Sequence, residues 1–156
     1  MGLIPRFYDV QEGEVLVDGV NVKDYDRRTL RRKIGYVPQK ALLFKGTIME
    51  NIRFGDDSAS DERVKEAAAI AQSTDFIEDK PDGFDSSISQ GGSNVSGGQR
   101  QRLAIARAIV RKPEIYVFDD SFSALDFKTD SALRQALSKE TGNATVVIVA
   151  QRVSTI

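Results

Sequence analysis

Apolar and polar residues alternate in two short runs in the segment VLVDGVNV, on either side of Asp18-Gly19. An Asp-Gly pair between such runs is the strongest short-range signal for a β-hairpin, because both turn positions need positive φ. A further strand is predicted over KIGYV, residues 33–37, and Pro38 ends it. Gln39 therefore lies just past a strand end, where its side chain can project into a crevice.

Helical spacing begins after Ser60, a capping residue followed by two acids that the helix dipole favours. The apolar stripe of this helix comprises Val64, Ala67, Ala68 and Ala71. A second short helix is predicted near 75–79 and ends in the Pro-Asp-Gly turn at 81–83. Residues 58–84 are thus predicted to form a helical lobe inserted between parts of a sheet.

The second half of the chain predicts a buried helix and two buried strands. Residues 100–111 carry apolar side chains on nearly every face, which is typical of a largely buried helix. The apolar run 115–118, followed by two aspartates, is typical of a strand covered on both faces in a parallel sheet. A helix over about 129–139 and a strand over 145–149 complete a right-handed crossover unit. The predicted fold class is α/β, with a parallel core sheet, an antiparallel accessory sheet and a helical insertion.

The first eight residues resemble the end of a helix. Leu3, Ile4 and Phe7 suit a helical face although Pro5 intervenes, so we expect a helix that ends near Tyr8. On this pattern the chain enters partway through a helix, as an excised piece of a larger protein would.

Composition restricts the chemistry that this chain can perform. Its 156 residues are one domain's length, with 22 Lys plus Arg against 23 Asp plus Glu. A net charge of -1 provides no basic surface for phosphate backbones, so we expect no nucleic-acid partner. Without Cys or His, the chain cannot build a thiolate or imidazole metal site, a disulfide or a Ser-His triad. The remaining carboxylate, amide, hydroxyl and backbone groups suit Mg²⁺ and phosphates.

The segment Ser96-Gly97-Gly98-Gln99 stands at the start of the helix predicted over residues 100–111. Unpaired N–H groups and the positive end of the dipole face any anion there, and the glycines let a phosphate approach the backbone. Ser96 and Gln99 would add side-chain hydrogen bonds. Taken alone, the segment could equally be a flexible Ser/Gly connector.

Asp119 and Asp120 follow at the distance that one buried helix and a turn would occupy. They end a predicted parallel strand, where α/β folds bind ligands, and a hydrophobic strand ending in Asp holds Mg²⁺ in nucleotide triphosphatases. An isolated pair of acids would more often be the solvated start of a loop. The glycine-rich segment before it makes the ligand site the stronger interpretation.

Together these motifs resemble the nucleotide-binding domain of ATP-binding cassette (ABC) transporters, and in particular of multidrug or lipid exporters. Five motifs follow the family's order: a Q-loop at Gln39, a signature at 95–99, a Walker B strand at 115–119, a D-loop at 123–126 and a switch region at 150–152. The segments PRFYDVQEGEVLVDG and LLFKGTIMENIRFG also look like exporter sequence. The resemblance implies a partial ABC ATPase domain over residues 1–156, with a helical subdomain at about 58–111.

The resemblance also implies a site for ATP and Mg²⁺. Its metal contacts would come from Asp119 and Gln39, and its catalytic positions are Asp120 and Gln151. The nucleotide-binding residues would be Gln39, Ser96, Gly97, Gly98, Gln99 and Asp126. Gln39 could instead be a plain turn residue, and the apolar residues 41–44 beside it could be core, docking surface or a mixture of the two.

The chain departs from the family's pattern at positions that matter for hydrolysis. It contains no Gly-Lys pair, so the phosphate-binding loop G-x-x-x-x-G-K-[ST] is expected upstream of residue 1. The family's general base is Glu, whereas Asp120 is one methylene shorter, and a misplacement of about 1 Å can cost roughly a hundredfold in rate. Gln151 takes the place of the usual switch His and cannot carry charge. Residues 89–92 lack the charged pair that is usual in exporters.

Such paired losses resemble the degenerate half of a heterodimeric exporter. The expected partners are a second ABC ATPase domain and a transmembrane domain of the same or a partner chain, at the cytoplasmic face of the membrane. Apolar runs such as 146–150 are far shorter than the roughly 18 residues of a membrane span. The signature would act in trans on the partner's ATP, while the chain's own site binds ATP and seldom hydrolyses it.

Two other functions stay open from the sequence. An ABC-type ATPase of the DNA-repair or chromosome-maintenance class shares these motifs, but the span between Gln39 and Ser96 is short and lacks the heptads of a coiled coil. A non-catalytic regulatory domain is the third interpretation. Arg102 and Arg107 are interpreted as structural ion pairs rather than phosphate ligands. Alone, the chain is expected to bind ATP very weakly and not to turn it over.

Overall fold

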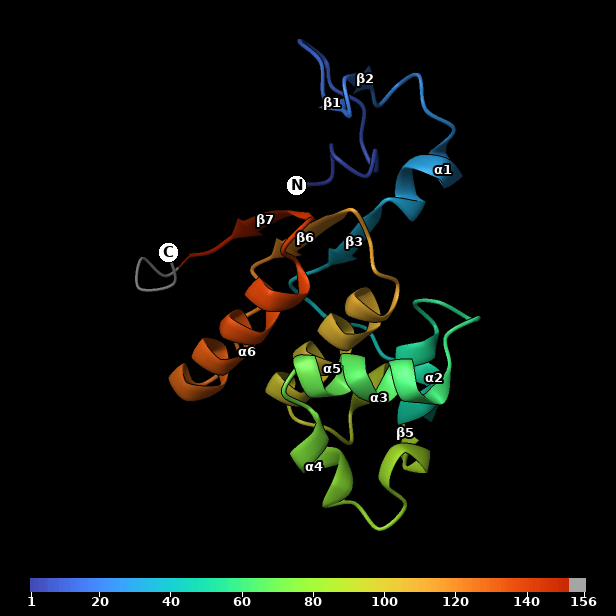
Figure 1. The fold of residues 1–156 in the computed structure, drawn as a ribbon, viewed down its shortest axis with the longest axis vertical. Coiled ribbons are helices and arrows are strands. Elements are labelled where there is room, and N and C mark those ends of the chain that lie inside the picture. The colour runs from blue at the N-terminus through green and yellow to red at the C-terminus, as the bar shows by residue number, and fades with distance from the viewer. Residues whose placement is uncertain (152–156) are drawn as a thin grey trace.

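The central layer of the protein is a parallel sheet of three strands, seen in a computed structural model that describes residues 1–151 (Figure 1). Its strand order is β3-β6-β7, formed by β3 (Ile34–Val37), β6 (Ile115–Asp119) and β7 (Thr145–Val149). β6 lies in the centre and is buried along most of its length. The parallel sheet and its β6-helix-β7 crossover confirm the predicted α/β class.

Register within this sheet aligns the carboxyl ends of all three strands. Val37 at the end of β3 pairs with Phe118 of β6, and Asp119 pairs with Val149 at the end of β7. The residues that follow β3 and β6 therefore emerge at one edge of the sheet. This is the edge where ligands bind in open α/β sheets.

Helices cover one side of the sheet, below the strands in Figure 1. The long helices α5 (Gly97–Val110) and α6 (Phe127–Glu140) are joined there by α2 (Ile48–Arg53), α3 (Asp61–Ile70) and α4 (Thr74–Glu78). The segment between α4 and α5 contains two short 3₁₀ turns, Gly83–Asp85 and Gln90–Gly92, and between them strand β5 (Ser87–Ile88). β5 pairs antiparallel with β4 (Gly46–Thr47), which directly precedes α2. A continuous apolar core joins these helices to the side chains of Val37, Tyr116 and Phe118.

The amino-terminal part of the chain lies on the other side of the sheet. The antiparallel hairpin of β1 (Leu16–Val17) and β2 (Val20–Asn21) has positive φ at both turn residues, Asp18 (51°) and Gly19 (76°), as predicted. It leads into α1 (Arg27–Arg32), whose Leu30 is fully buried in a second apolar cluster with Val117 of β6.

Local capping signals account for most of the helix starts. Ser60 caps α3 by accepting a hydrogen bond from the Arg63 backbone, as predicted. α2 was not predicted, yet its start carries a capping box in which Thr47 and Glu50 each bond the other's backbone N–H. Thr-x-x-Glu before an apolar run is a readable signal, and the helix is so short that its periodicity is weak.

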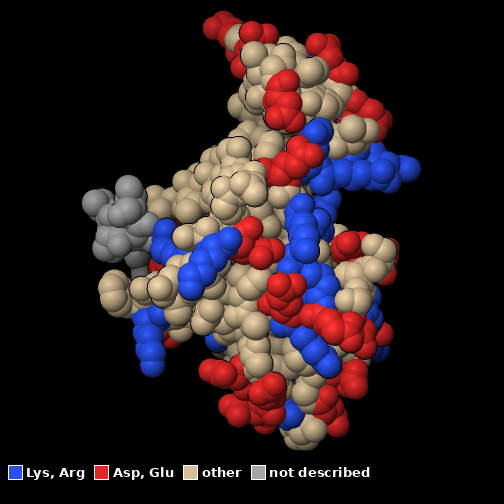
Figure 2. Space-filling view, viewed as in Figure 1, with Lys and Arg blue, Asp and Glu red and all other residues tan. Residues whose placement is uncertain are grey.

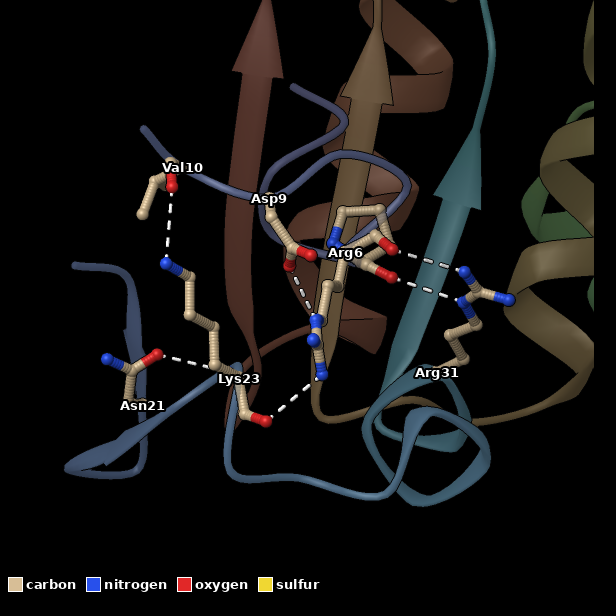
Figure 3. A network of polar contacts seen from close by, with 7 residues as sticks. Arg6, Asp9, Val10, Asn21, Lys23 and Arg31 are labelled. Carbon is tan, nitrogen blue, oxygen red and sulfur yellow. Dashed lines mark hydrogen bonds and ion pairs between the residues drawn. The ribbon is translucent and has the colours of Figure 1, made fainter. Parts of the chain in front are cut away.

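The predicted helix over the first eight residues is wrong. Residues 1–8 form successive turns, and Arg6 has a φ of 54°. Polar contacts hold this segment. Arg31 donates to the carbonyls of Pro5 and Arg6, and Arg6 donates to the carbonyl of Lys23 and, locally, to Asp9 (Figure 3). The segment is thereby fastened to α1 and to the chain that follows the hairpin.

The visible surface mixes both signs of charge. Figure 2 shows acidic side chains around the hairpin and at the opposite end, and basic side chains gathered near α1. This mixture agrees with the net charge of -1, and the side seen in Figure 2 is not dominated by one sign. Among the described residues, no helix has the length and apolar character needed to cross a membrane.

Gly55, which follows α2, provides a test of how α2 packs on α5. A Cβ added at Gly55 would lie 2.0 Å from the Arg107 carbonyl oxygen and 2.8 Å from Val110 Cγ1. We expect Gly55→Ala to lower the free energy of unfolding by about 1–3 kcal/mol through overpacking. Chemical denaturation measures this loss. Gly142→Ala is the control, because its Cβ would meet nothing closer than 3.9 Å. Equal free energies of unfolding for the two variants would contradict the close packing of Gly55 on α5.

Candidate functional site

The carboxyl edge of β3 and β6 brings the first predicted site residues together. Gln39 Nε2 donates to Asp120 Oδ2 at 3.2 Å, although the two residues are 81 positions apart in sequence. Gln39 follows β3 and Asp120 follows β6, so the aligned strand ends explain the contact. The sequence predicted each position separately, and the structure places them in direct contact.

Asp119 has a different partner on the same edge. The Tyr36 hydroxyl donates to Asp119 Oδ2 at 2.9 Å, across adjacent strands. Burial, and then the bond to Asp119, raises the pKa of Tyr36 to about 12. The phenol is therefore protonated throughout the physiological pH range and acts as a neutral donor. Sequence reasoning missed Tyr36, because nothing in local periodicity says which strand residue faces Asp119.

The backbone after β6 is held in a tight turn. Asp120 has a φ of 49°, in the left-handed region that Asp tolerates better than most residues, and its N–H donates to the Val149 carbonyl at 2.9 Å. The buried Ser121 hydroxyl donates to the Val37 carbonyl at 2.7 Å. Contacts to both neighbouring strands thus fix the direction in which Asp120 leaves the sheet.

Ser96 and Gln99 form a capping box at the start of α5. The Ser96 hydroxyl oxygen accepts from the Gln99 backbone, and Gln99 Oε1 accepts from the Ser96 backbone, each at 3.1 Å. The Ser96 hydroxyl hydrogen and the Gln99 side-chain NH₂ have no partner among the described residues. The helix therefore begins at Gly97, three residues before the predicted start at residue 100, and its cap leaves two donors available.

Glycine at position 98 permits close packing of α5 on the segment after β6. A Cβ at Gly98 would lie 3.0 Å from the Ala124 carbonyl oxygen and 3.7 Å from Leu125 Cδ2. At Gly97 the nearest such atom is the Ala124 Cβ at 3.7 Å, which is ordinary contact. Gly98 therefore has a packing role in addition to any approach by a phosphate.

Gln101 joins three parts of the site and was missed from the sequence. Its side chain is buried; Oε1 accepts from the Ala124 backbone at 3.0 Å, and Nε2 donates to Ser123 Oγ at 3.2 Å and weakly to the Gln39 carbonyl at 3.5 Å. An uncharged polar residue within a helix predicted to be largely buried was the available signal, because a buried amide needs partners.

Asp126 caps α6. Its carboxylate accepts from the Thr129 backbone at 2.8 Å and from the Thr129 hydroxyl at 3.0 Å, and these bonds lower the pKa of Asp126. The cap explains why the helix begins at Phe127, two residues before the predicted start. A nucleotide contact of Asp126 stays a prediction.

Gln151 is exposed at the end of the described chain. It lines a small hollow with Asp120, Ser123 and Asp130, so two of the predicted catalytic positions border the same space. Arg152, the last member of the predicted switch region, lies outside the described residues.

Arg102 and Arg107 are structural, but the predicted ion pairs are wrong. Arg102 donates to the Gln72 carbonyl at 2.6 Å and lies over the Phe76 ring. Arg107 donates to the carbonyls of Leu42 and Asn51, and desolvation lowers the pKa of Arg107 to about 10. Within residues 1–151 neither guanidinium is paired with a carboxylate. Carbonyls and aromatic faces satisfy these cations instead.

The donor set at the sheet edge fits Mg²⁺. The carboxylate of Asp119 and the amide oxygen of Gln39 are hard oxygen ligands, and the carboxylate of Asp120 lies beside them. In the part of the chain that the structure describes, no group of three or more acidic side chains could enclose a metal by itself. Mg²⁺ needs no such cage, since it keeps several waters and binds one or two carboxylates together with substrate phosphates.

Comparison with known proteins agrees with this arrangement. A family model described as ABC transporter matches residues 1–123. An ABC transporter ATP-binding protein of Mycobacterium tuberculosis is 47% identical over 157 residues, covering 99% of this chain and 27% of that protein. A Staphylococcus aureus protein that carries the name multidrug export ATP-binding/permease protein is 46% identical over 156 residues, covering 100% of this chain and 27% of that protein.

One solved structure has the same fold. The structure of a bacterial Atm1-family ABC exporter with ATP bound has a TM-score of 0.96 and 40% sequence identity, covering 99% of this chain and 27% of that chain. The chain thus spans about a quarter of the length of the relatives that it matches. The named relatives are transporters, which disfavours the chromosome-maintenance alternative.

Replacement of Gln101 tests whether it fixes the segment after β6. We expect Gln101→Leu to lower the free energy of unfolding by about 1–3 kcal/mol, because the Ala124 N–H would lose its acceptor. Hydrogen exchange of the amides of residues 121–126 should accelerate. Gln135→Leu, at an exposed position of α6, is the control. Unchanged exchange at residues 121–126 in Gln101→Leu would contradict this role.

Proposed function

The chain belongs to the ABC transporter family, and we propose that it forms part of the ATP-binding and ATP-hydrolysing domain of an exporter. The observation that carries the proposal is the contact of Gln39 with Asp120, beside Asp119, at the carboxyl ends of two adjacent parallel strands. Ligands of α/β folds bind at this edge, and a hydrophobic strand ending in Asp is the Mg²⁺-holding element of nucleotide triphosphatases.

Asp119 and Gln39 would hold Mg²⁺ at this edge, directly or through water. When bound, Mg²⁺ neutralises charge on the β- and γ-phosphates of ATP. The carboxylate of Asp119 and the amide oxygen of Gln39 would orient that ion, while the Gln39 NH₂ donates to Asp120 Oδ2 at 3.2 Å. ATP and Mg²⁺ are therefore the cofactors of the proposed function.

Asp120 occupies the position of a general base and is poorly suited to it. Its carboxylate is one methylene shorter than Glu, and one of its oxygens already accepts from Gln39. Gln151, across the same hollow, is neutral at every pH and cannot support charge transfer. The chain's own site would accordingly retain ATP and seldom hydrolyse it, as in the degenerate half of a heterodimeric exporter.

The start of α5 is suited to act on a nucleotide held by a second ABC ATPase domain. The Ser96 hydroxyl hydrogen and the Gln99 NH₂ stay available as donors, and α5 is a 14-residue helix whose amino-terminal end attracts anions. Gly97 and Gly98 leave the backbone open to a phosphate. We expect these residues to contact the γ-phosphate of the partner's ATP.

An apolar groove beside Gln39 suits the transmembrane part of the exporter. The groove encloses about 400 Å³ and includes Pro38, Leu42, Phe54 and Arg107 among its lining residues. Leu42 is 66% and Phe54 is 62% exposed, whereas the neighbouring Leu43 is 1% exposed and belongs to the core. The relative from S. aureus is named as a permease as well as an ATP-binding protein, and most of its length lies beyond this chain. A cytoplasmic segment of such a permease is the proposed occupant.

This docking would hold the chain at the cytoplasmic face of a membrane. It also gives the predicted helical subdomain, residues 58–111, a function. α3 and α4 pack with α5 in one core, and α5 carries both the groove residue Arg107 and the signature. Movement of a docked segment would therefore reach the signature through a single rigid helix.

A purely regulatory domain is the remaining alternative, and ATP binding distinguishes it. The 156-residue chain by itself should bind ATP more weakly than about 1 mM in calorimetry and should not turn it over, because it contains no G-x-x-x-x-G-K-[ST] loop. A chain that includes such a loop upstream should bind ATP with Mg²⁺ dependence. Tight ATP binding by the 156 residues alone would contradict the expectation that the upstream loop supplies the main phosphate contacts. Absence of ATP binding by the longer chain would favour the regulatory alternative.

The role of the signature in trans is tested by removing its hydroxyl. In the assembled exporter, Ser96→Ala should lower ATPase activity about a hundredfold, the effect of losing one donor to developing charge. Ser60→Ala is the matched control, since Ser60 caps α3 through the same kind of hydrogen bond and lies away from the site. If Ser96→Ala retained the same ATPase activity as Ser60→Ala, the proposed role of Ser96 would be contradicted.

A further inference from the structure

We propose that Tyr36 is a positioning residue that orients the carboxylate of Asp119 at the Mg²⁺-nucleotide site. The inference rests on the proposed function, because it concerns how this chain prepares a metal contact. Tyr36 lies in β3, upstream of Gln39, and belongs to none of the motifs that the sequence singled out.

Strand register brings the two side chains together. Tyr36 pairs with Val117 in the parallel ladder, and Asp119 lies two residues beyond Val117. Because successive side chains point to opposite faces of a sheet, Tyr36, Val117 and Asp119 share one face. The Tyr36 hydroxyl then reaches along that face to Asp119 Oδ2 at 2.9 Å.

Neighbouring groups hold the Tyr36 ring in this orientation. Phe7 contacts it edge to face, with ring centroids 5.2 Å apart and planes at 87°. The Arg31 guanidinium lies over the other ring, 5.2 Å from the Phe7 centroid, and donates to the carbonyls of Pro5 and Arg6. Figure 3 shows this segment passing in front of the sheet, where Arg6 and Arg31 fasten it. The phenol is therefore set before any ligand arrives.

The hydrogen bond leaves Asp119 able to contact a cation. Within residues 1–151 the Tyr36 hydroxyl is the only hydrogen-bond donor to the Asp119 side chain, and it uses one oxygen. The lone pairs of Oδ1 stay available for Mg²⁺ or its water. Ligating carboxylates are commonly hydrogen-bonded in this way, and loss of such a partner typically costs about 10- to 100-fold in metal affinity or activity.

The carboxylates of Asp119 and Asp120 are thus oriented by different residues. Gln39 holds Asp120, and Tyr36 holds Asp119. Loss of the Tyr36 hydroxyl should therefore affect the metal contact and leave the Gln39–Asp120 pair in place. If Tyr36 only supported the fold, its substitution would weaken nucleotide binding to the same extent with and without metal.

The test uses Tyr36→Phe in a full-length exporter chain that carries this segment, with Mn²⁺ as the probe. Electron paramagnetic resonance titration in the presence of saturating ADP should show Mn²⁺ affinity about tenfold weaker than in the unsubstituted protein. Affinity for ADP in EDTA should be unchanged. Tyr25→Phe is the matched control, because Tyr25 packs against the same apolar cluster as Tyr36 and its phenol donates at 3.0 Å to the Val17 carbonyl instead of to Asp119.

Three other results would each overturn the inference, and each has a different meaning. Normal Mn²⁺ affinity in Tyr36→Phe, with a loss in Asp119→Asn, would overturn the role of Tyr36 and leave the proposed function standing. Equal losses of ADP affinity with Mn²⁺ and in EDTA would show that Tyr36 only supports the fold. Absence of ADP-dependent Mn²⁺ binding in the unsubstituted protein would overturn the proposed function together with this inference.

Discussion

The parallel register of β3 and β6 is the constraint on which the rest of the site depends. It places Val37 beside Phe118, so the residues that follow each strand leave the sheet at the same edge. The hydrogen bond from Gln39 to Asp120 depends on this alignment, because the two residues are 81 positions apart. A shift of one residue would turn every side chain of β3 to the opposite face and separate the pair.

Buried and capping polar groups then connect this edge to the helices. The Gln101 amide links α5 to the Gln39 carbonyl and to the segment after β6, and the Ser96–Gln99 capping box fixes the first turn of the same helix. Both devices satisfy backbone groups that would otherwise lack partners, since unpaired buried polar groups are costly. The helix that carries the signature is therefore tied to the strand ends by hydrogen bonds of its own side chains, and not by apolar packing alone.

In this protein a motif that matches the family does not guarantee that the side chains perform the family's chemistry. The chain keeps the fold of its exporter relatives, while the two predicted catalytic positions carry an acid shorter than Glu, Asp120, and an uncharged amide, Gln151. Arg107 illustrates a similar separation. A cation on the signature helix suggests phosphate or ion-pair chemistry, yet the structure surrounds it with carbonyls and the rings of Phe44 and Phe54.

The sequence by itself determined the local elements. The Asp18-Gly19 hairpin, the Ser60 cap and the buried strand before Asp119 depend on residues close together in the chain, and the structure has each of them. The predicted strands also placed Gln39 and Asp120 at strand ends. Tertiary structure decided which side chains meet: the partner of Asp119 is Tyr36, and contacts from Arg31 override the helical pattern of the first residues. These outcomes depend on register and long-range packing, which local periodicity does not encode.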